Sequence, residues 1–143
     1  MKQANILLVD DEKDFIDTMA KRLEKRNLKI SKTFSGEDAL KFLSGHPETE
    51  VVILDVKMPG MNGIETLKEI KRFYPLIEVI MLTGHATVNS GIEGMKLGAV
   101  DYLTKPCDLD HLLAKVDEAA TKKRRHEEKI MEARLRELSI RRP

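Results

Sequence analysis

The sequence predicts an α/β fold, a doubly wound parallel sheet of five strands with helices on both faces. Three observations predict it: five short apolar segments recur along the 143 residues, three of them are nearly continuous in Val, Ile and Leu, and segments with helical spacing lie between them. Strands covered on both faces have such unbroken apolar runs, and strands that alternate with helices form parallel sheets.

The five apolar segments each have the length of an ordinary strand. The first, third and fourth have almost no polar residue, so we expect both of their faces to be covered. The expected strands cover residues 5–9, 28–34, 51–54, 77–82 and 99–103.

Apolar stripes at helical spacing fill the segments that follow the expected strands. Ser35, Asn62 and Asp108 precede three of the stripes as candidate N-caps, and an acid follows Ser35 and Asn62 three residues later. The stripes are Phe15, Met19 and Leu23; Ala39, Leu40 and Leu43; Ile64, Leu67 and Ile70; Val88, Ile92 and Met95; and Leu109, Leu112, Leu113 and Val116.

Composition and length are those of a single soluble domain, with 41% hydrophobic and 34% charged residues. One cysteine, Cys107, excludes an internal disulfide and fits a reducing compartment. The N-terminal apolar run is too short for a signal peptide or a membrane span. We therefore expect a cytoplasmic protein without a membrane partner.

Charge divides the chain into two regions. Residues 121–143 carry nine Lys or Arg against four Glu, a net charge of +5, which leaves −4 for residues 1–120 of a chain whose total is +1. We expect 121–143 to continue the last helix as a basic extension or linker. Met131, Leu135 and Leu138 form a single heptad, too short to hold a coiled coil alone. The basic run 122–125 has no nucleic-acid motif behind it, so direct nucleic-acid binding is not expected.

Polar residues follow four of the five expected strands, and the carboxyl ends of parallel strands share one edge of the sheet. A single Asp at a strand end is usually a turn residue or a helix cap. Here several groups converge on one edge, which argues for a site. The groups are Asp10, Asp11 and Glu12 after the first strand, Asp55 after the third, Thr83 after the fourth and Lys105 after the fifth.

The chemistry of these groups indicates a phosphoryl-accepting site. Carboxylates that crowd together repel, and a hard divalent cation, Mg²⁺ or alternatively Mn²⁺, removes that conflict. Lys105 supplies a positive charge and Thr83 a hydroxyl donor where negative charge accumulates. Asp55 would then be the nucleophile that becomes an aspartyl phosphate.

Four motifs resemble the receiver domain of two-component response regulators: "LLVDDE" (7–12), "ILDVKMPGMNG" (53–63), "MLTGHA" (81–86) and "DYLTKP" (101–106). With the helices between them they cover roughly residues 4 to 120. The resemblance implies the flavodoxin-like receiver fold, with strand order 2-1-3-4-5, for residues 1–120.

The resemblance also implies roles for individual residues. Asp55 is the phosphoacceptor, and Asp10 and Asp11 hold Mg²⁺ together with Asp55 and the backbone carbonyl of Lys57. Thr83 and Lys105 contact the phosphoryl oxygens.

Further positions follow from the same resemblance. Tyr102 is a switch aromatic that turns inward when Thr83 moves. The Lys105–Pro106 peptide bond is expected to be cis. Lys57 and His85, two residues after the phosphoacceptor and two after the Thr, would tune dephosphorylation.

The resemblance implies protein partners. The donor is a sensor histidine kinase or a phosphotransfer protein, because none of the chain's histidines has the setting of a kinase donor helix. The chain itself is not an enzyme beyond its own phosphorylation and dephosphorylation. Its fourth helix, fifth strand and fifth helix would signal to a downstream protein or output domain, and that surface or the C-terminal helix offers a route to a homodimer. The histidines are His46, His85, His111 and His126.

Several alternatives stay open at the level of sequence. The chain is a stand-alone regulator, or it is the excised regulatory domain of a DNA-binding transcription activator, which "TGHAT…GAVDYLTKP" and the helical tail resemble. An unrelated alternative is a Mg²⁺-dependent phosphatase of the haloacid dehalogenase type, although that family has Asp-x-Asp after its first strand and a cap domain. A nucleotide-binding flavodoxin-like module lacks support, because no Gly-rich loop follows the first strand.

Overall fold

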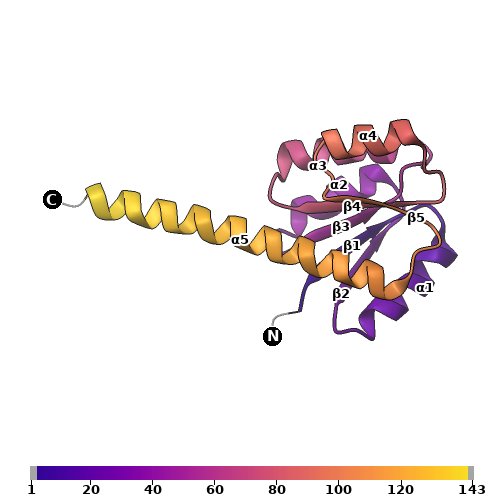
Figure 1. The fold of residues 1–143 in the computed structure, drawn as a ribbon, viewed down its shortest axis with the longest axis horizontal. Coiled ribbons are helices and arrows are strands. Elements are labelled where there is room, and N and C mark those ends of the chain that lie inside the picture. Colours follow the sequence, from indigo (N-terminus) through magenta and orange to yellow (C-terminus); the bar gives the residue numbers. More distant parts are fainter. Residues whose placement is uncertain (1–2, 142–143) are drawn as a thin grey trace.

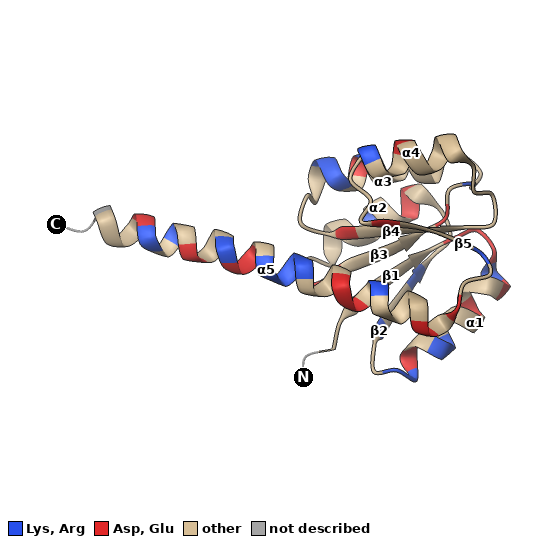
Figure 2. Ribbon diagram, in the orientation of Figure 1, with Lys and Arg blue, Asp and Glu red and all other residues tan. Residues whose placement is uncertain are grey.

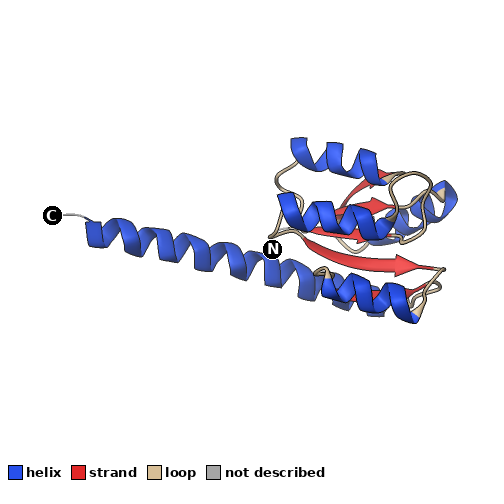
Figure 3. Cartoon of the chain, turned by 90° about the horizontal axis from the view of Figure 1, so that it is seen from above, coloured by secondary structure: helices blue, strands red, loops and turns tan. Residues whose placement is uncertain are grey.

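The computed structural model describes residues 3–141, so Met1 and Lys2 of the predicted region 1–120, and Arg142 and Pro143 of the predicted extension, lie outside the described residues. Five parallel strands form one sheet in the expected order β2-β1-β3-β4-β5, and all arrows point away from the protruding end of the last helix (Figure 3). The strands are β1 (Asn5–Val9), β2 (Lys29–Thr33), β3 (Val51–Leu54), β4 (Glu78–Thr83) and β5 (Asp101–Thr104).

Helices cover both faces of this sheet, as expected for a doubly wound fold. Helices α1 and α5 lie on one face, and α2, α3 and α4 lie on the other (Figure 1). The helices are α1 (Lys13–Glu24), α2 (Gly36–Gly45), α3 (Gly63–Phe73), α4 (Val88–Lys96) and α5 (Leu109–Arg141).

The core consists of two apolar layers that the central strands separate. In β1, Ile6 and Leu8 pack into the layer beneath α1 and α5, whereas Leu7 and Val9 pack into the layer beneath α2 and α3. Successive side chains of a strand point to opposite faces, so a strand between two helical layers needs apolar residues at every position. This arrangement explains the unbroken apolar runs of β1, β3 and β4, whose residues from Ile6, Val51 and Glu78 onward are all buried.

The bounds of β1 and β3 are the expected ones, and those of β2, β4 and β5 differ from the expected ones by one or two residues. The largest difference is at β5, which begins at Asp101 instead of residue 99. Ala99 donates its backbone N–H to Gly94 at the end of α4, 3.0 Å away, instead of joining the ladder. At the other end β4 continues to Thr83, which pairs with Thr104. The helix end and the neighbouring strand therefore determine these boundaries.

The expected N-caps are all present. Ser35 Oγ accepts the backbone N–H of Asp38 at 3.1 Å, and Asp108 Oδ2 accepts that of His111 at 3.3 Å. Asn62 and Glu65 form a reciprocal capping box at the start of α3. These caps satisfy backbone donors that a helix leaves unpaired in its first turn.

Helix α4 presents a different face to the core from the one that its apolar stripe indicates. Val88, Ile92 and Met95 are exposed, with 79%, 51% and 49% of their surface accessible. The buried residue of α4 is Gly94, where an added Cβ atom would lie 3.6 Å from the Tyr102 ring. The stripe predicted the helix correctly and its buried face wrongly, because a glycine contributes no hydrophobic signal to a periodic pattern.

Helix α5 is anchored to the base of the sheet before it protrudes. Glu50, just before β3, is almost completely buried, and Arg124 binds it through two hydrogen bonds of 2.6 and 3.0 Å. Lys122 Nζ lies 3.5 Å from buried Glu78 at the start of β4. The basic run that begins at Lys122 therefore neutralises buried carboxylates of the sheet. No described helix has the length and apolar character to span a membrane.

Candidate functional site

Three carboxylates meet at the carboxyl edge of the sheet. Asp10, Asp11 and Asp55 each place a carboxylate oxygen within 4.8 Å of the others, and red segments gather at this end of the strands in Figure 2. Adjacent strands bring them together, because Val9 pairs with Leu54 and the Asp55 N–H donates to the Val9 carbonyl. Asp10 and Asp55 are buried, whereas Asp11 is exposed.

Short hydrogen bonds orient the two buried carboxylates. Asp10 Oδ1 accepts the backbone N–H of Glu12 at 3.0 Å. Asp55 Oδ1 accepts the N–H of Val56 at 2.8 Å. In each carboxylate the second oxygen, Oδ2, is left to accept a hydrogen bond or to pair with a cation.

Lys105 provides that partner. Its Nζ atom lies 2.5 Å from Asp10 Oδ2 and 3.7 Å from Asp55 Oδ2, and it also contacts Glu12 Oε1 at 3.0 Å. The Lys105–Pro106 peptide bond is cis, and the Lys105 N–H donates to the Thr83 carbonyl at 2.9 Å. The end of β5 is thus held against β4 while the ammonium group enters the acidic cluster.

Electrostatics at this cluster favour the charged form of Lys105 and disfavour ionisation of Asp10 beside Asp55. Burial raises the pKa of Asp10, the charge of Asp55 adds to that rise, and hydrogen bonds from Lys105 and Glu12 oppose it. Burial acts against the ammonium of Lys105, but its hydrogen bonds to Asp10 and Glu12 outweigh burial and raise the pKa of Lys105. The buried carboxylates of Asp10 and Asp55 share the Lys105 ammonium with the exposed Glu12, and the oxygen donors that remain fit a hard divalent cation.

A cavity of about 390 Å³ opens beside Asp55. Asp55 is the buried carboxylate of its lining, and Lys57 and His85 belong to its wall, so both can approach a group attached to Asp55. The remaining lining residues are Asp11, Glu12, Met58 and Pro59.

Thr83 and Tyr102 lie on the neighbouring strands β4 and β5. Thr83 is fully buried as the last residue of β4, and its Oγ1 accepts the N–H of His85 at 3.0 Å. The half-buried Tyr102 has its hydroxyl 2.6 Å from Ser90 Oγ in α4. The tyrosine hydroxyl is therefore bound to α4.

The sequence alone did not indicate the role of Phe15. The apolar pattern placed it among the core residues of the first helix, but its ring lies under Lys105, with Nζ 4.0 Å from the ring centroid. A cation over an aromatic face is attracted to the ring quadrupole. Only the orientation of α1 against the end of β5 brings the two together, so no sequence signal could have found the pair.

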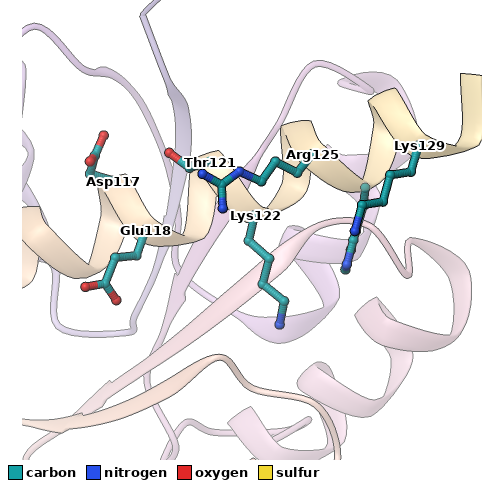
Figure 4. Close-up of a pocket in the computed structure, with 7 residues that line it drawn as sticks. Asp117, Glu118, Thr121, Lys122, Arg125 and Lys129 are labelled. Carbon is teal, nitrogen blue, oxygen red and sulfur yellow. The ribbon is translucent and has the colours of Figure 1, made fainter. Parts of the chain in front are cut away.

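A second hollow lies away from the acidic cluster and is lined entirely by residues of α5, among them Asp117, Lys122 and Lys129 (Figure 4). Acidic residues line one end and basic residues the other. None of the predicted site residues belongs to its lining.

Comparison with known proteins agrees with this geometry. The family model of the response regulator receiver domain matches residues 6–117. The chain is 35% identical over 131 residues to the transcriptional regulatory protein ZraR of Klebsiella oxytoca, covering 92% of this chain and 29% of that protein. It is 31% identical to the DNA-binding transcriptional regulator NtrC of Proteus hauseri, covering 85% of this chain and 25% of that protein. The chain thus spans about a quarter to a third of these curated relatives.

Solved structures agree in the same way. A response regulator receiver domain from Clostridium thermocellum superposes with a TM-score of 0.81 at 34% identity, covering 85% of this chain and 97% of the other. The structure of NtrX from Brucella abortus also superposes with a TM-score of 0.81, at 29% identity. The match covers 91% of this chain and 30% of the NtrX chain.

These matches do not support the haloacid dehalogenase alternative. The acids after β1 are adjacent instead of spaced as Asp-x-Asp, and Asp55 follows β3. The edge of the sheet where Lys105 meets the acids, and the motifs that build it, lie inside the matched range of residues 6–117. The chain belongs to the response regulator receiver domain family.

Proposed function

We propose that the chain accepts a phosphoryl group on Asp55 from a phosphohistidine of a sensor histidine kinase or phosphotransfer protein. The observation that carries the proposal is the position of Lys105 Nζ, 2.5 Å from Asp10 and 3.7 Å from Asp55. A cation next to a buried, cavity-facing carboxylate is the setting in which charge can build up on an incoming phosphoryl group.

Asp10, Asp11 and Asp55, together with the backbone carbonyl of Lys57, would hold Mg²⁺, with Mn²⁺ as an alternative. The three clustered carboxylates support this assignment, since hard oxygen donors are what both ions prefer. When bound, the ion supplies positive charge that offsets repulsion between the acids and the phosphoryl oxygens.

The transfer breaks one bond and forms another. An Asp55 carboxylate oxygen attacks phosphorus, the P–N bond to the donor imidazole breaks, and the imidazole nitrogen takes up a proton. Lys105 and Thr83 contact the phosphoryl oxygens of the aspartyl phosphate. The chain is no enzyme toward other substrates. It promotes only this transfer and the later hydrolysis, in which water attacks phosphorus, the bond to the Asp55 oxygen breaks, and inorganic phosphate leaves.

The phosphorylated state would change the surface formed by α4, β5 and α5. The new group carries about −1.5 to −2 charges at neutral pH. Thr83 Oγ1 would leave the His85 N–H to contact it, and Tyr102 would leave Ser90 and turn inward. The two states exchange as a population shift, so the active state exists as a minor species before phosphorylation.

Lys57 and His85 would tune the lifetime of the phosphoryl group. Their place in the wall of the cavity beside Asp55 supports this, because water must reach the phosphorus through that space.

Residues 1–120 would form the phosphoacceptor domain and 121–143 an extension or linker. The chain's relatives ZraR, a transcriptional regulatory protein, and NtrC, a DNA-binding transcriptional regulator, support the excised regulatory domain of a transcription activator as the context. A downstream protein or an output domain would read the α4–β5–α5 surface in the cytoplasm, and a homodimer would form through that surface or through α5. Lys122 and Arg124 pair with carboxylates of the sheet, which supports a structural role for the basic run instead of direct nucleic-acid binding.

Incubation with Mg²⁺ and a small acyl-phosphate donor tests the proposal by intact-protein mass. The parent chain should gain one phosphoryl group only when Mg²⁺ is present. Asp55→Asn should gain none, while Asp14→Asn, an exposed residue of α1, should behave as the parent. A gain of the same size in Asp55→Asn would refute the assignment.

A further inference from the structure

The loop between β3 and α3 is tied to α2 by a single long-range hydrogen bond. This loop, residues 55–62, carries Lys57. Glu37, in the first turn of α2, accepts the backbone N–H of Met61 through Oε1 at 2.9 Å, across 24 positions of sequence. The proposed function gives the Lys57 carbonyl to the metal ion, so the loop's position bears directly on metal binding.

Packing shows that α2 and the loop are in direct contact around this bond. Gly60 has a φ of +72°, and a Cβ atom there would lie 3.0 Å from Glu37 Oε1. A Cβ atom at Gly36 would lie 3.1 Å from the Met61 carbonyl oxygen and 2.1 Å from Thr66 Oγ1. A side chain at Gly36 would clash, and one at Gly60 would press on the Glu37 carboxylate, so the corner of the loop fits closely against the start of α2.

Little else fixes the middle of this loop. Its ends are held by the Gly63 N–H, which donates to the Val56 carbonyl at 2.7 Å, and by the capping box at Asn62. Between these ends, within residues 3–141, Met61 is the residue whose backbone N–H has a hydrogen-bond acceptor, and that acceptor is Glu37. Met58 adds apolar burial. Glu37 is therefore the polar group that sets the position of the corner.

The bond is to an ionised acceptor. The Met61 N–H is the main cause that lowers the pKa of Glu37. A backbone donor paired with a carboxylate is stronger than one paired with a neutral oxygen. An amide at this position would keep the shape of the contact but not its charge.

We propose that Glu37 is a positioning residue for metal binding, which holds the β3–α3 loop so that the Lys57 carbonyl meets the acidic cluster before the ion arrives. This inference rests on the proposed function, which assigns the Lys57 carbonyl to the ion. Glu37 itself contacts neither the ion nor the phosphoryl group.

Two measurements on the full chain, both without a phosphoryl donor, test the inference. The first is the hydrogen-exchange rate of the Met61 amide by NMR in the absence of Mg²⁺. The second is the Mg²⁺ dissociation constant from an NMR titration. The variants are Glu37→Ala and the isosteric Glu37→Gln, with Asp38→Ala as matched control, since Asp38 lies in the same turn and its carboxylate has no hydrogen bond or ion pair among the described residues.

In Glu37→Ala we expect exchange at Met61 to rise about tenfold and the Mg²⁺ dissociation constant to rise about three- to fivefold. Glu37→Gln should lie between this variant and the parent, and Asp38→Ala should match the parent in both measurements. Thermal melting of each variant separates these local effects from a loss of α2.

Unchanged Mg²⁺ affinity in Glu37→Ala would overturn the proposal. A loss of Mg²⁺ affinity in Asp38→Ala as large as that in Glu37→Ala would overturn it too. A parent chain that binds no Mg²⁺ would overturn the link to the ion whatever the exchange rates. A chain that binds Mg²⁺ in a Glu37-dependent manner but accepts no phosphoryl group would instead refute the proposed function and leave the role of Glu37 standing.

Discussion

Nζ of Lys105 lies 3.7 Å from Oδ2 of Asp55, so strands β5 and β3 bring opposite charges together above the end of β4. The same ammonium is closer to Asp10, at 2.5 Å. Asp10 therefore pairs more closely with the ammonium. Asp55 Oδ2 has a longer contact with Lys105, and Asp55 lines the cavity. This division of roles explains how two buried carboxylates can coexist, and it supports the proposal of Asp55 as the nucleophile.

Asp10→Asn should stabilise the chain at neutral pH in the absence of divalent ions. Burial makes the Asp10 carboxylate costly to ionise, and the neutral amide retains an acceptor for the Glu12 N–H. We expect Tm to rise by about 2–5 °C in calorimetry. Asp14→Asn, in the exposed first turn of α1, should bring no such gain.

Mg²⁺ should make the parent chain more stable than Asp10→Asn, the opposite of the order expected without the ion. A ligand that binds only the folded state raises its stability in proportion to the logarithm of ligand concentration over the dissociation constant. Millimolar Mg²⁺ should therefore raise Tm of the parent and have a smaller effect on Asp10→Asn. An equal rise in both proteins would argue against Asp10 as a metal ligand.

Phe15→Leu should make the ammonium of Lys105 less favourable. The ring faces Nζ at 4.0 Å, and a cation–π contact of this kind contributes about 0.5–1 kcal/mol or more. Losing it removes an interaction that favours the charged form, so the pKa of Lys105 should fall. A ¹³C titration of the Lys105 Cε resonance measures this, Phe15→Tyr should restore the parent value, and identical titrations of Phe15→Leu and parent would contradict the contact.

Arg124→Met should cost more stability than Glu50→Gln. The Glu50 side chain is 4% exposed and that of Arg124 is 37% exposed, so removing the arginine leaves a buried carboxylate without its cation. We expect a loss of about 3 kcal/mol in Arg124→Met and about 1 kcal/mol in Glu50→Gln, measured by urea unfolding. The reverse order would show that the pair is not held as described.

The same pair predicts a pH dependence. Burial opposes ionisation of Glu50, but the hydrogen bonds that Glu50 accepts and the nearby cations, Arg124 first among them, together outweigh burial and lower its pKa from 4.5. Because the folded state holds this proton less tightly than the unfolded chain, the stabilisation is complete above about pH 4.5 and is lost as pH falls through the lower value. Glu50→Gln should therefore lose less stability than the parent on acidification from pH 5.

Gly63→Ala should disturb the acidic cluster through the backbone. A Cβ atom at Gly63 would lie 1.9 Å from the Asp55 carbonyl oxygen and 2.7 Å from the Val56 Cα atom. No rotamer change relieves a clash with backbone, so we expect a loss of about 3 kcal/mol together with slower phosphoryl acceptance. Gly45→Ala, where the added Cβ atom meets nothing within 4 Å, is the matched control and should unfold as the parent does.

The sequence was sufficient to predict the edge of the sheet where the site lies. Asp10, Asp55 and Lys105 each follow an apolar run, and parallel strands bring their carboxyl ends to one edge whatever the details of packing. The spacing and composition of the apolar segments are enough to place these three residues at the same edge. The burial of β1, β3 and β4 on both faces was likewise predictable from their nearly continuous apolar residues.

Contacts that depend on helix orientation were not predictable. Phe15 meets Lys105, and Glu37 meets Met61, only because α1 and α2 pack with a particular rotation. The basic run at Arg124 was expected only as part of a helical extension or linker, yet Arg124 binds a carboxylate 74 residues away in sequence. A sequence pattern indicates which face of a helix or strand is apolar. It does not indicate which polar groups of other elements will contact that helix or strand.

The central claim is that Asp55 itself becomes an acyl phosphate, and chemical trapping tests it most directly. After incubation with Mg²⁺ and an acyl-phosphate donor, borohydride reduction converts a phosphorylated aspartate to homoserine, which peptide mass mapping locates. We predict homoserine at position 55 and at no other acidic residue, with no conversion when Mg²⁺ is omitted. Conversion at Asp10 or Asp11 instead, or an unmodified Asp55 in a chain that has gained a phosphoryl group, would contradict the account.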